Sequence, residues 1–115
     1  MKALRILTLM ALGCAADSAF AADTDINQMH QDYMAAMGGM HDSMQAGMTE
    51  KDPDMAFAKG MVPHHSGAVE MAKIELKYGK DPQMRALAEK VIQTQSQEIT
   101  EMNAWMAAHP AAHTN

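Results

Sequence analysis

The 115-residue sequence has little of what most functional classes need: one cysteine, 4% aromatic residues and no basic cluster. With Trp105 as the only tryptophan, a lone core has few large anchors, so oligomerisation or metal binding is expected to add stability. The net charge of −5 argues against nucleic acid and anionic membrane surfaces as partners. No Walker loop, Gly-rich dinucleotide turn or nucleophile elbow is present. These absences leave metal binding or protein interaction as the functions to consider.

The first 21 residues have the pattern of a secretory signal. Lys2 and Arg5 precede the apolar run Ile6–Ala16, and Ala19-Phe20-Ala21 supplies a small-x-small cleavage site. The run is shorter than the roughly 20 residues that span a bilayer, so no membrane insertion is expected after processing. We therefore expect a periplasmic protein. A lipoprotein signal ending at Cys14 and an N-terminal core helix are the alternatives.

Processing after Ala21 would remove 21 of the 115 residues and leave 94, with no cysteine and twelve of the fourteen methionines. Exported compartments oxidise thiols, so a thiolate metal site there would compete with disulfide formation. Methionine forms no disulfide and keeps a soft sulfur donor, at the risk of slower oxidation to the sulfoxide. Thioether and neutral imidazole ligands favour Cu(I) over hard ions. This composition therefore points to a soft metal.

Three helices and no strand are predicted, which makes the fold all-α. A Met/His-rich N-terminal segment, residues 22–53, contains a helix from about Asp25 to Gly47 that Gly38-Gly39 should loosen. Residues 54–109 form a helical hairpin. Its first helix opens near Asp52-Pro53 and stops at Gly79, with a kink at Pro63. Its second starts with Asp81 as N-cap and ends near His109, and residues 110–115 are expected to be a disordered tail.

Methionine and histidine recur along one side of the first predicted helix. Steps of four and three residues connect the members of this stripe, which are His30, Met34, Met37, His41, Met44 and Met48. The stripe contains no leucine, isoleucine or valine, and Met40 lies at its edge. Methionine stripes are often core packing, which is the alternative here. A flexible surface of soft ligands explains the missing aliphatic residues better, so we predict metal binding along the stripe.

The second predicted helix contains two adjacent histidines, His64 and His65. Because neighbours differ by about 100° around a helix, the two rings cannot share one face. Met61 shares a face with His65, and Met71 shares one with His64. We therefore predict a metal site at the pair. The alternative is that one histidine is a core residue bonded to the third helix and the other is solvated.

The short Gly79–Asp81 connection brings residues that are equally far from the turn to the same level. His65 then comes level with Gln95, Met61 comes level with Glu98 and Ile99, and Met102 lies about one turn beyond Met61. These residues can gather in one layer, where Glu98 either orients a ligating imidazole or accepts a hydrogen bond with no metal present. A ferritin-type di-iron site is not expected, because the sequence contains no Glu-x-x-His.

Residues 54–107 resemble the domain-of-unknown-function 305 family through two segments. These are Met-x-Pro-His-His-x-x-Ala-x-x-Met-Ala at residues 61–72, and Gln95, Glu98-Ile99, Met102 and Trp105. The resemblance implies a ferritin-like helical fold, export and, in the methionine-rich CopM-like members, binding of copper or silver linked to copper tolerance. The site residues that it implies are Met61, His64, His65, Met71, Glu98 and Met102. A single short copy of the motif raises the question of whether two chains pair to complete a bundle.

From the sequence we expect the chain to bind Cu(I), with Ag(I) and Cu(II) as further candidates. We expect it to sequester or carry the ion without catalysing a reaction. A homodimer and a copper-delivery partner protein are the expected protein contacts. Two alternatives stay open. One is a small copper-dependent oxidoreductase, and the other is a helical interaction module whose methionines form an adaptable surface.

Overall fold

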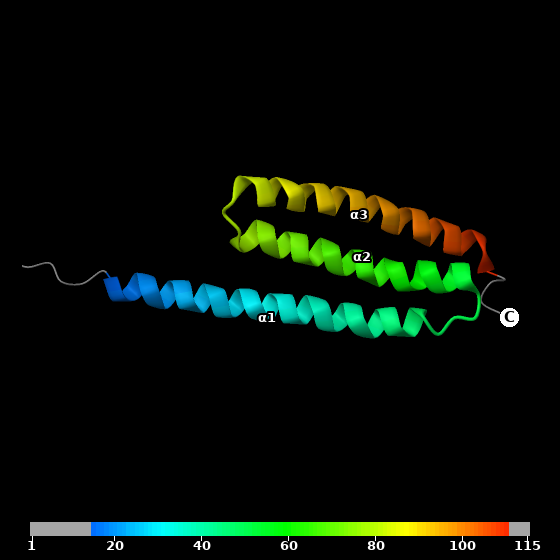
Figure 1. Cartoon of the computed structure of the whole chain (residues 1–115), viewed down its shortest axis with the longest axis horizontal. Coiled ribbons are helices and arrows are strands. Elements are labelled where there is room, and N and C mark those ends of the chain that lie inside the picture. The colour runs from blue at the N-terminus through cyan, green and yellow to red at the C-terminus, as the bar shows by residue number, and fades with distance from the viewer. Residues whose placement is uncertain (1–14, 111–115) are drawn as a thin grey trace, which may run out of the picture.

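The structure is a computed structural model that describes residues 15–110, with side chains from Ala22 onward. This part of the chain forms three helices, α1 (Ala15–Gly47), α2 (Pro53–Tyr78) and α3 (Pro82–Ala108), and contains no strand. The all-α prediction is therefore confirmed. Figure 1 shows α2 and α3 as the predicted antiparallel hairpin. Most of the expected signal (residues 1–14) and the expected tail beyond Pro110 lie outside the described residues.

The two hairpin helices begin and end where the sequence predicts, because their capping residues act locally. The Asp52 carboxylate accepts a hydrogen bond from the Met55 backbone N–H at 2.8 Å. Asp81 accepts bonds from the backbone N–H groups of Gln83 and Met84 at 2.9 and 3.0 Å. Gly79 ends α2 in an extended conformation, with φ −70° and ψ 147°.

The prediction for the start of the first helix was wrong, since α1 begins at Ala15 and not near Asp25. Residues 15–24 are rich in alanine, the residue with the highest intrinsic helix propensity, and nothing in this stretch stops the helix. The helix also continues through Gly38-Gly39. Export and cleavage after Ala21 stay predictions. None of the helices in residues 15–110 is both long enough and apolar enough to cross a membrane.

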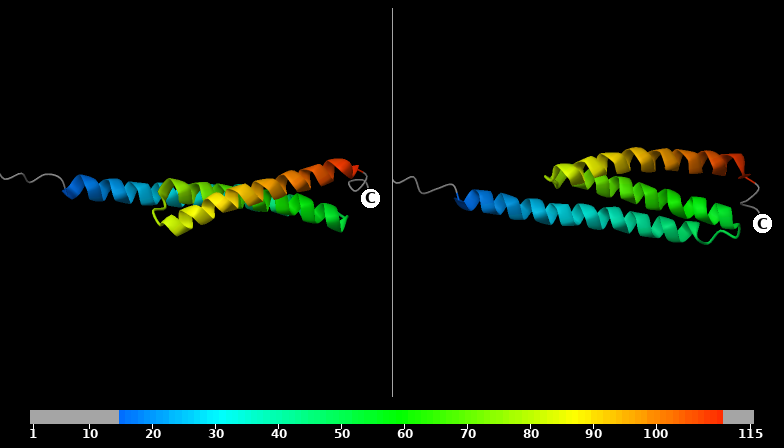
Figure 2. Two further views of the ribbon diagram at one scale, coloured as in Figure 1. Left: turned by 90° about the horizontal axis from the view of Figure 1, so that it is seen from above. Right: turned by 45° about the horizontal axis from the view of Figure 1, so that its top comes forward.

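The three helices lie side by side in one layer with α2 in the middle (Figures 1 and 2), and both α1 and α3 pack extensively against α2. Arg85 of α3 holds the hairpin turn, because its guanidinium donates to the backbone carbonyls of Leu76 at 2.8 Å and Gly79 at 2.9 Å. These carbonyls belong to the C-terminal end of α2, where a positive charge is favourable.

Because the three helices form a single layer, the layer has two open faces.

α1 contacts α2 at glycines. A Cβ atom placed on Gly47 would lie 2.6 Å from the carbonyl carbon of Lys59, so only glycine allows this approach. A Cβ atom on Gly67 would lie 2.5 Å from the sulfur of Met40, which rests against the glycine. Farther along the same seam, Asp32 accepts hydrogen bonds of 2.8 Å from Lys77 and Tyr78. These contacts run along the length of α2 and set the register of α1.

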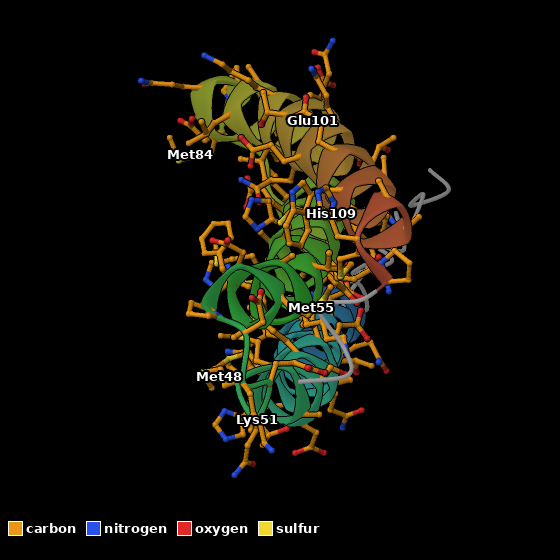
Figure 3. All side chains as sticks on the ribbon, turned by 90° about the vertical axis from the view of Figure 1, so that its right-hand side faces the viewer. Met48, Lys51, Met55, Met84, Glu101 and His109 are labelled. Carbon is orange, nitrogen blue, oxygen red and sulfur yellow. The ribbon has the colours of Figure 1, made fainter. Side chains whose placement is uncertain are left out.

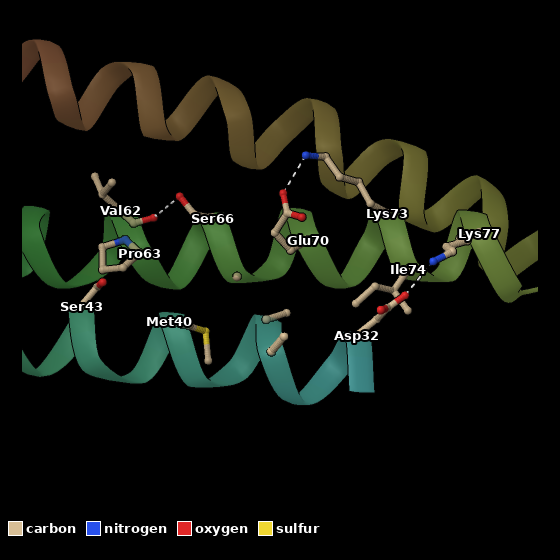
Figure 4. A pocket seen from close by; sticks show the side chains of 14 residues that line it. Asp32, Met40, Ser43, Val62, Pro63, Ser66, Glu70, Lys73, Ile74 and Lys77 are labelled. Atoms are coloured by element: carbon tan, nitrogen blue, oxygen red, sulfur yellow. Dashed lines mark hydrogen bonds and ion pairs between the residues drawn. The ribbon is translucent and has the colours of Figure 1, made fainter. Parts of the chain in front are cut away.

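One face of the α1–α2 seam is an open groove with a volume of about 870 Å³, lined by apolar side chains such as Met40, Val62 and Ile74 and edged by charged ones (Figure 4). Ion pairs lie on this side, among them Glu70 with Lys73 at 2.7 Å and Asp32 with Lys77 at 2.8 Å. The hydrophobic core of the described chain is small. Its members are Met55, Ala58, Val69, Ala72, Ile74 and Ala88.

Candidate metal centre

The buried histidine of the pair is His65, and it is held by a carboxylate of α3. Its residue surface is 7% exposed, and its Nε2 lies 2.5 Å from Oε2 of Glu98, whose side chain is half exposed. α2 supplies the imidazole near its middle, and α3 supplies Glu98, which lies three residues beyond Gln95, the residue that the hairpin register places level with His65. A neutral imidazole in this contact donates its Nε2–H to the carboxylate.

The other ring nitrogen of His65, Nδ1, is buried and has no hydrogen-bond partner among the described residues. When Nε2 carries the proton, Nδ1 carries a lone pair. Leaving a buried polar atom unsatisfied costs about 1–3 kcal/mol. Histidines that bind metals through one nitrogen commonly donate the other N–H to a carboxylate. His65 and Glu98 share this carboxylate contact, and the buried Nδ1 is the ring nitrogen that has no hydrogen bond.

His64 is exposed, and its ring centroid lies 5.9 Å from that of His65. The pair therefore divides into one buried and one solvated histidine, which is also the geometry of the non-metal alternative. The unpartnered Nδ1 is the feature of this pair that needs an explanation, because most buried polar atoms have a hydrogen-bond partner.

Three methionines from two helices line a groove of about 300 Å³ on the α1–α2 seam. Met44 and Met48 come from the end of α1, and Met61 comes from α2, one helical turn before His65. Ala56, Phe57 and Gly60 complete the lining. Thioether sulfurs are soft donors, so this group can hold a soft cation.

Met102 lies in a second groove, of about 530 Å³, between α2 and α3. Phe57 lines this groove and the methionine groove alike, which places both on the same face of the layer. The predicted layer of donors is thus divided into His65 with Glu98, Met61 with the α1 methionines, and Met102 beside Trp105. The site prediction did not include Phe57. Its position four residues before Met61 could have placed it on the same helix face.

The stripe on α1 is largely solvent-exposed and is not a packed core. His30, Met34, Met37, His41 and Met48 are exposed, and Met44 is half-buried. The residue that packs against α2 is Met40, through Gly67. Met71 on α2 is also exposed, two turns beyond His64.

Among the described residues, no group of three or more histidine, cysteine, aspartate or glutamate side chains is arranged to hold a metal ion. Hard ions prefer such oxygen-rich clusters.

The fold and the site together define a class of protein. Its members have three helices in one layer and a histidine of the middle helix that is held by a carboxylate. The chain belongs to the family described as Domain of unknown function (DUF305), whose model matches residues 8–106. It is also similar to a protein of Acanthamoeba polyphaga mimivirus described as "Uncharacterized protein L153", with 43% identity over 51 residues, which is 44% of this chain. The match spans about a third of that relative's length, 34%.

Proposed function

We propose that this protein binds Cu(I), and also Ag(I), in an exported compartment and sequesters or carries the ion without catalysing a reaction. The observation that carries the proposal is the orphaned Nδ1 of His65, whose opposite nitrogen is held by Glu98. A soft cation at Nδ1 would satisfy a buried lone pair that no described residue satisfies. The periplasm, with copper tolerance as the purpose, is the setting that we propose from the sequence.

The exposed methionines give a physical route for capture. The exposed methionines of this region are Met34 and Met37 of α1 and Met48 at its end. The methionine groove, which Met44 and Met61 line, lies on the same face. An ion that binds weakly to single thioethers can exchange between neighbouring sulfurs, because each such bond is readily replaced. His65, one turn from Met61, would then hold the ion more firmly than the exposed sulfurs.

A Cu(I) titration in competition with a strong chelator, under reducing and oxygen-free conditions, tests the proposal. The purified protein should compete at micromolar affinity or tighter. His65→Ala should weaken binding, whereas His109→Ala, an exposed histidine that stacks on Trp105 at the end of α3, should not. Absence of Cu(I) binding, or equal affinity of both variants and the wild type, would contradict the proposal.

Glu98 is a positioning residue in this proposal. Glu98→Ala should lower Cu(I) affinity by about 10- to 100-fold, the usual effect of removing a carboxylate that orients a ligating histidine. Glu98→Gln keeps an acceptor for the Nε2–H and should retain more affinity. Glu101→Ala is the matched control, because this carboxylate on the next turn accepts a bond from Gln97 and not from His65. If Glu98→Ala and Glu101→Ala behave alike, Glu98 has no role in binding.

The interaction-module alternative is favoured by one observation, which is the number of large apolar side chains that stay exposed. Metal binding and protein association are separable, since the first is read by the chelator titration and the second by molecular mass. Turnover measurements separate the oxidoreductase alternative, because a carrier binds in fixed stoichiometry and does not oxidise Cu(I) repeatedly.

A further inference from the structure

The two faces of the helix layer differ in chemistry. One side of α2 carries charged and polar residues at helical spacing, namely Lys59, Ser66, Glu70, Lys73 and Lys77. Three ion pairs lie along this side: Lys59 with Glu50, Lys73 with Glu70 at 2.7 Å, and Lys77 with Asp32 at 2.8 Å. Figure 4 shows the last two at the edge of the 870 Å³ groove. This polar face is suited to contact with water.

The large apolar side chains that are exposed in the described chain lie on the opposite face, which we call the Met face. On α2, Phe57 and Met71 belong to a row that also contains Met61 and His64, on the side away from the lysines. Figure 3 shows Met48, the residue that follows α1, and Met84 of α3 on the same side of the layer. The Met face is made of Ile26, Met34, Met37, Met48, Phe57, Met71, Met84 and Leu87, each 43–69% exposed.

The size of the Met face matches one side of a protein interface. Aromatic side chains have areas of about 150–250 Å² each, and methionine, leucine and isoleucine are somewhat smaller, so eight that are about half exposed present roughly 600–800 Å². Stable interfaces bury about 800 Å² per partner, whereas the largest apolar patch of a typical monomer is about 300–600 Å². The core of the described chain is meanwhile limited to six hydrophobic residues, three of them alanine. The apolar area left open is therefore large compared with the area that the single chain buries.

The area of the Met face, together with the low charge over most of it, favours a second copy of the same chain as its partner. A two-fold dimer places each patch against an identical patch, so any row of like charges would oppose itself. The α1 stripe that runs along this face contains only methionine and histidine, and the acidic residues Asp54 and Glu101 of the Met102 groove lie at the end of the layer where α2 begins. The ion pairs lie on the other face and would stay in solvent.

We propose that a second copy of this chain covers the Met face, with two three-helix layers packed face to face about a two-fold axis. Met61, His64 and the α1 stripe then lie in or beside the interface. The dimer itself does not depend on the proposed copper function. If that function holds, soft donors of both chains line one shared space between the two copies.

Sedimentation of the metal-free protein, with a chelator present, tests the dimer. We expect a dimer at micromolar concentration. Leu87→Glu, which adds charge to the Met face outside the proposed metal donors, should weaken the dimer by about tenfold or more while helicity by circular dichroism stays intact. Ala86→Glu is the matched control. It lies next to Leu87 on α3, is exposed and points about 100° away, so it should leave the dimer unchanged.

A monomeric metal-free protein would overturn the proposal, and so would equal weakening of the dimer by Leu87→Glu and Ala86→Glu. A monomer that cosediments with phosphatidylglycerol vesicles would assign the Met face to a membrane surface instead. Because no copper is present, failure of copper binding does not affect this test. A monomer that binds Cu(I) would overturn the dimer and leave the proposed function standing.

Discussion

Gly47 of α1 lies against the backbone carbonyl of Lys59 in α2. This carbonyl is the one that Pro63 cannot bond, since proline has no N–H to donate to the residue four positions earlier. A Cβ atom on Gly47 would lie 2.7 Å from the Lys59 oxygen and 2.6 Å from its carbonyl carbon. α2 nevertheless continues through Pro63 as a helix. The proline site of α2 and the end of α1 are therefore packed together.

Gly47→Ala should destabilise the protein. The added methyl group meets backbone atoms, which cannot move aside as a side chain can, and overpacking of this kind costs about 1–3 kcal/mol. Gly38→Ala is the matched control, because a Cβ atom there meets nothing within 4 Å and should stabilise α1 by about 1 kcal/mol. Urea unfolding followed by helical circular dichroism measures both, and the same sign of change for the two variants would refute the seam contact.

Acid should weaken the attachment of α1 to α2 through Asp32. Lys77 first, and Gln28 and Tyr78 next, donate hydrogen bonds to this carboxylate and lower its pKa to about 2. A pKa that is lower in the folded state means that the carboxylate stabilises the fold above its ordinary pKa. That stability is lost as the pH falls from about 4 to about 2.

Asp32→Asn should therefore lower the melting temperature at neutral pH and flatten its decrease in this acid range. Asp42→Asn, an exposed carboxylate on the same helix, serves as control. Melting curves recorded across the acid range measure the effect. An unchanged acid profile in Asp32→Asn would show that the contact with Lys77 contributes nothing to stability.

Silver ions should protect particular methionines from peroxide. Ag(I) shares the preference of Cu(I) for thioethers and does not itself change oxidation state under mild peroxide, so sulfurs that bind it lose their reactive lone pair. Oxidation of Met44, Met48 and Met61 should slow severalfold, while Met84, which is exposed but lies outside the proposed site, should be unaffected. Fully buried Met55 should oxidise slowest with or without silver.

Peptide mass spectrometry after timed peroxide exposure measures each sulfoxide. Uniform protection of all exposed methionines, Met84 included, would indicate non-specific binding. No protection anywhere would argue against the methionine groove as a soft-metal site.

Local signals in the sequence were sufficient for the hairpin. Asp52-Pro53 and Asp81-Pro82 start the helices through side-chain bonds to nearby backbone N–H groups, so their effect needs no tertiary structure. The tight turn then determined which residues of α2 and α3 come level, and Glu98 lies against His65 close to that register. The start of α1 was not predicted, because its alanine-rich residues carry no stop signal.

The sequence by itself determined that the chain is helical, that it is rich in thioether and imidazole side chains, and where the hairpin turns, since these follow from residue chemistry and short-range bonds. Only the tertiary structure decided that His65 and not His64 is buried, because adjacent residues point about 100° apart and the position of α3 selects one of them. It also brought Met61 to Met44 and Met48, through a glycine seam whose register depends on backbone contact between α1 and α2. The separation of a Met face from a polar face likewise exists only once three helices lie in one layer.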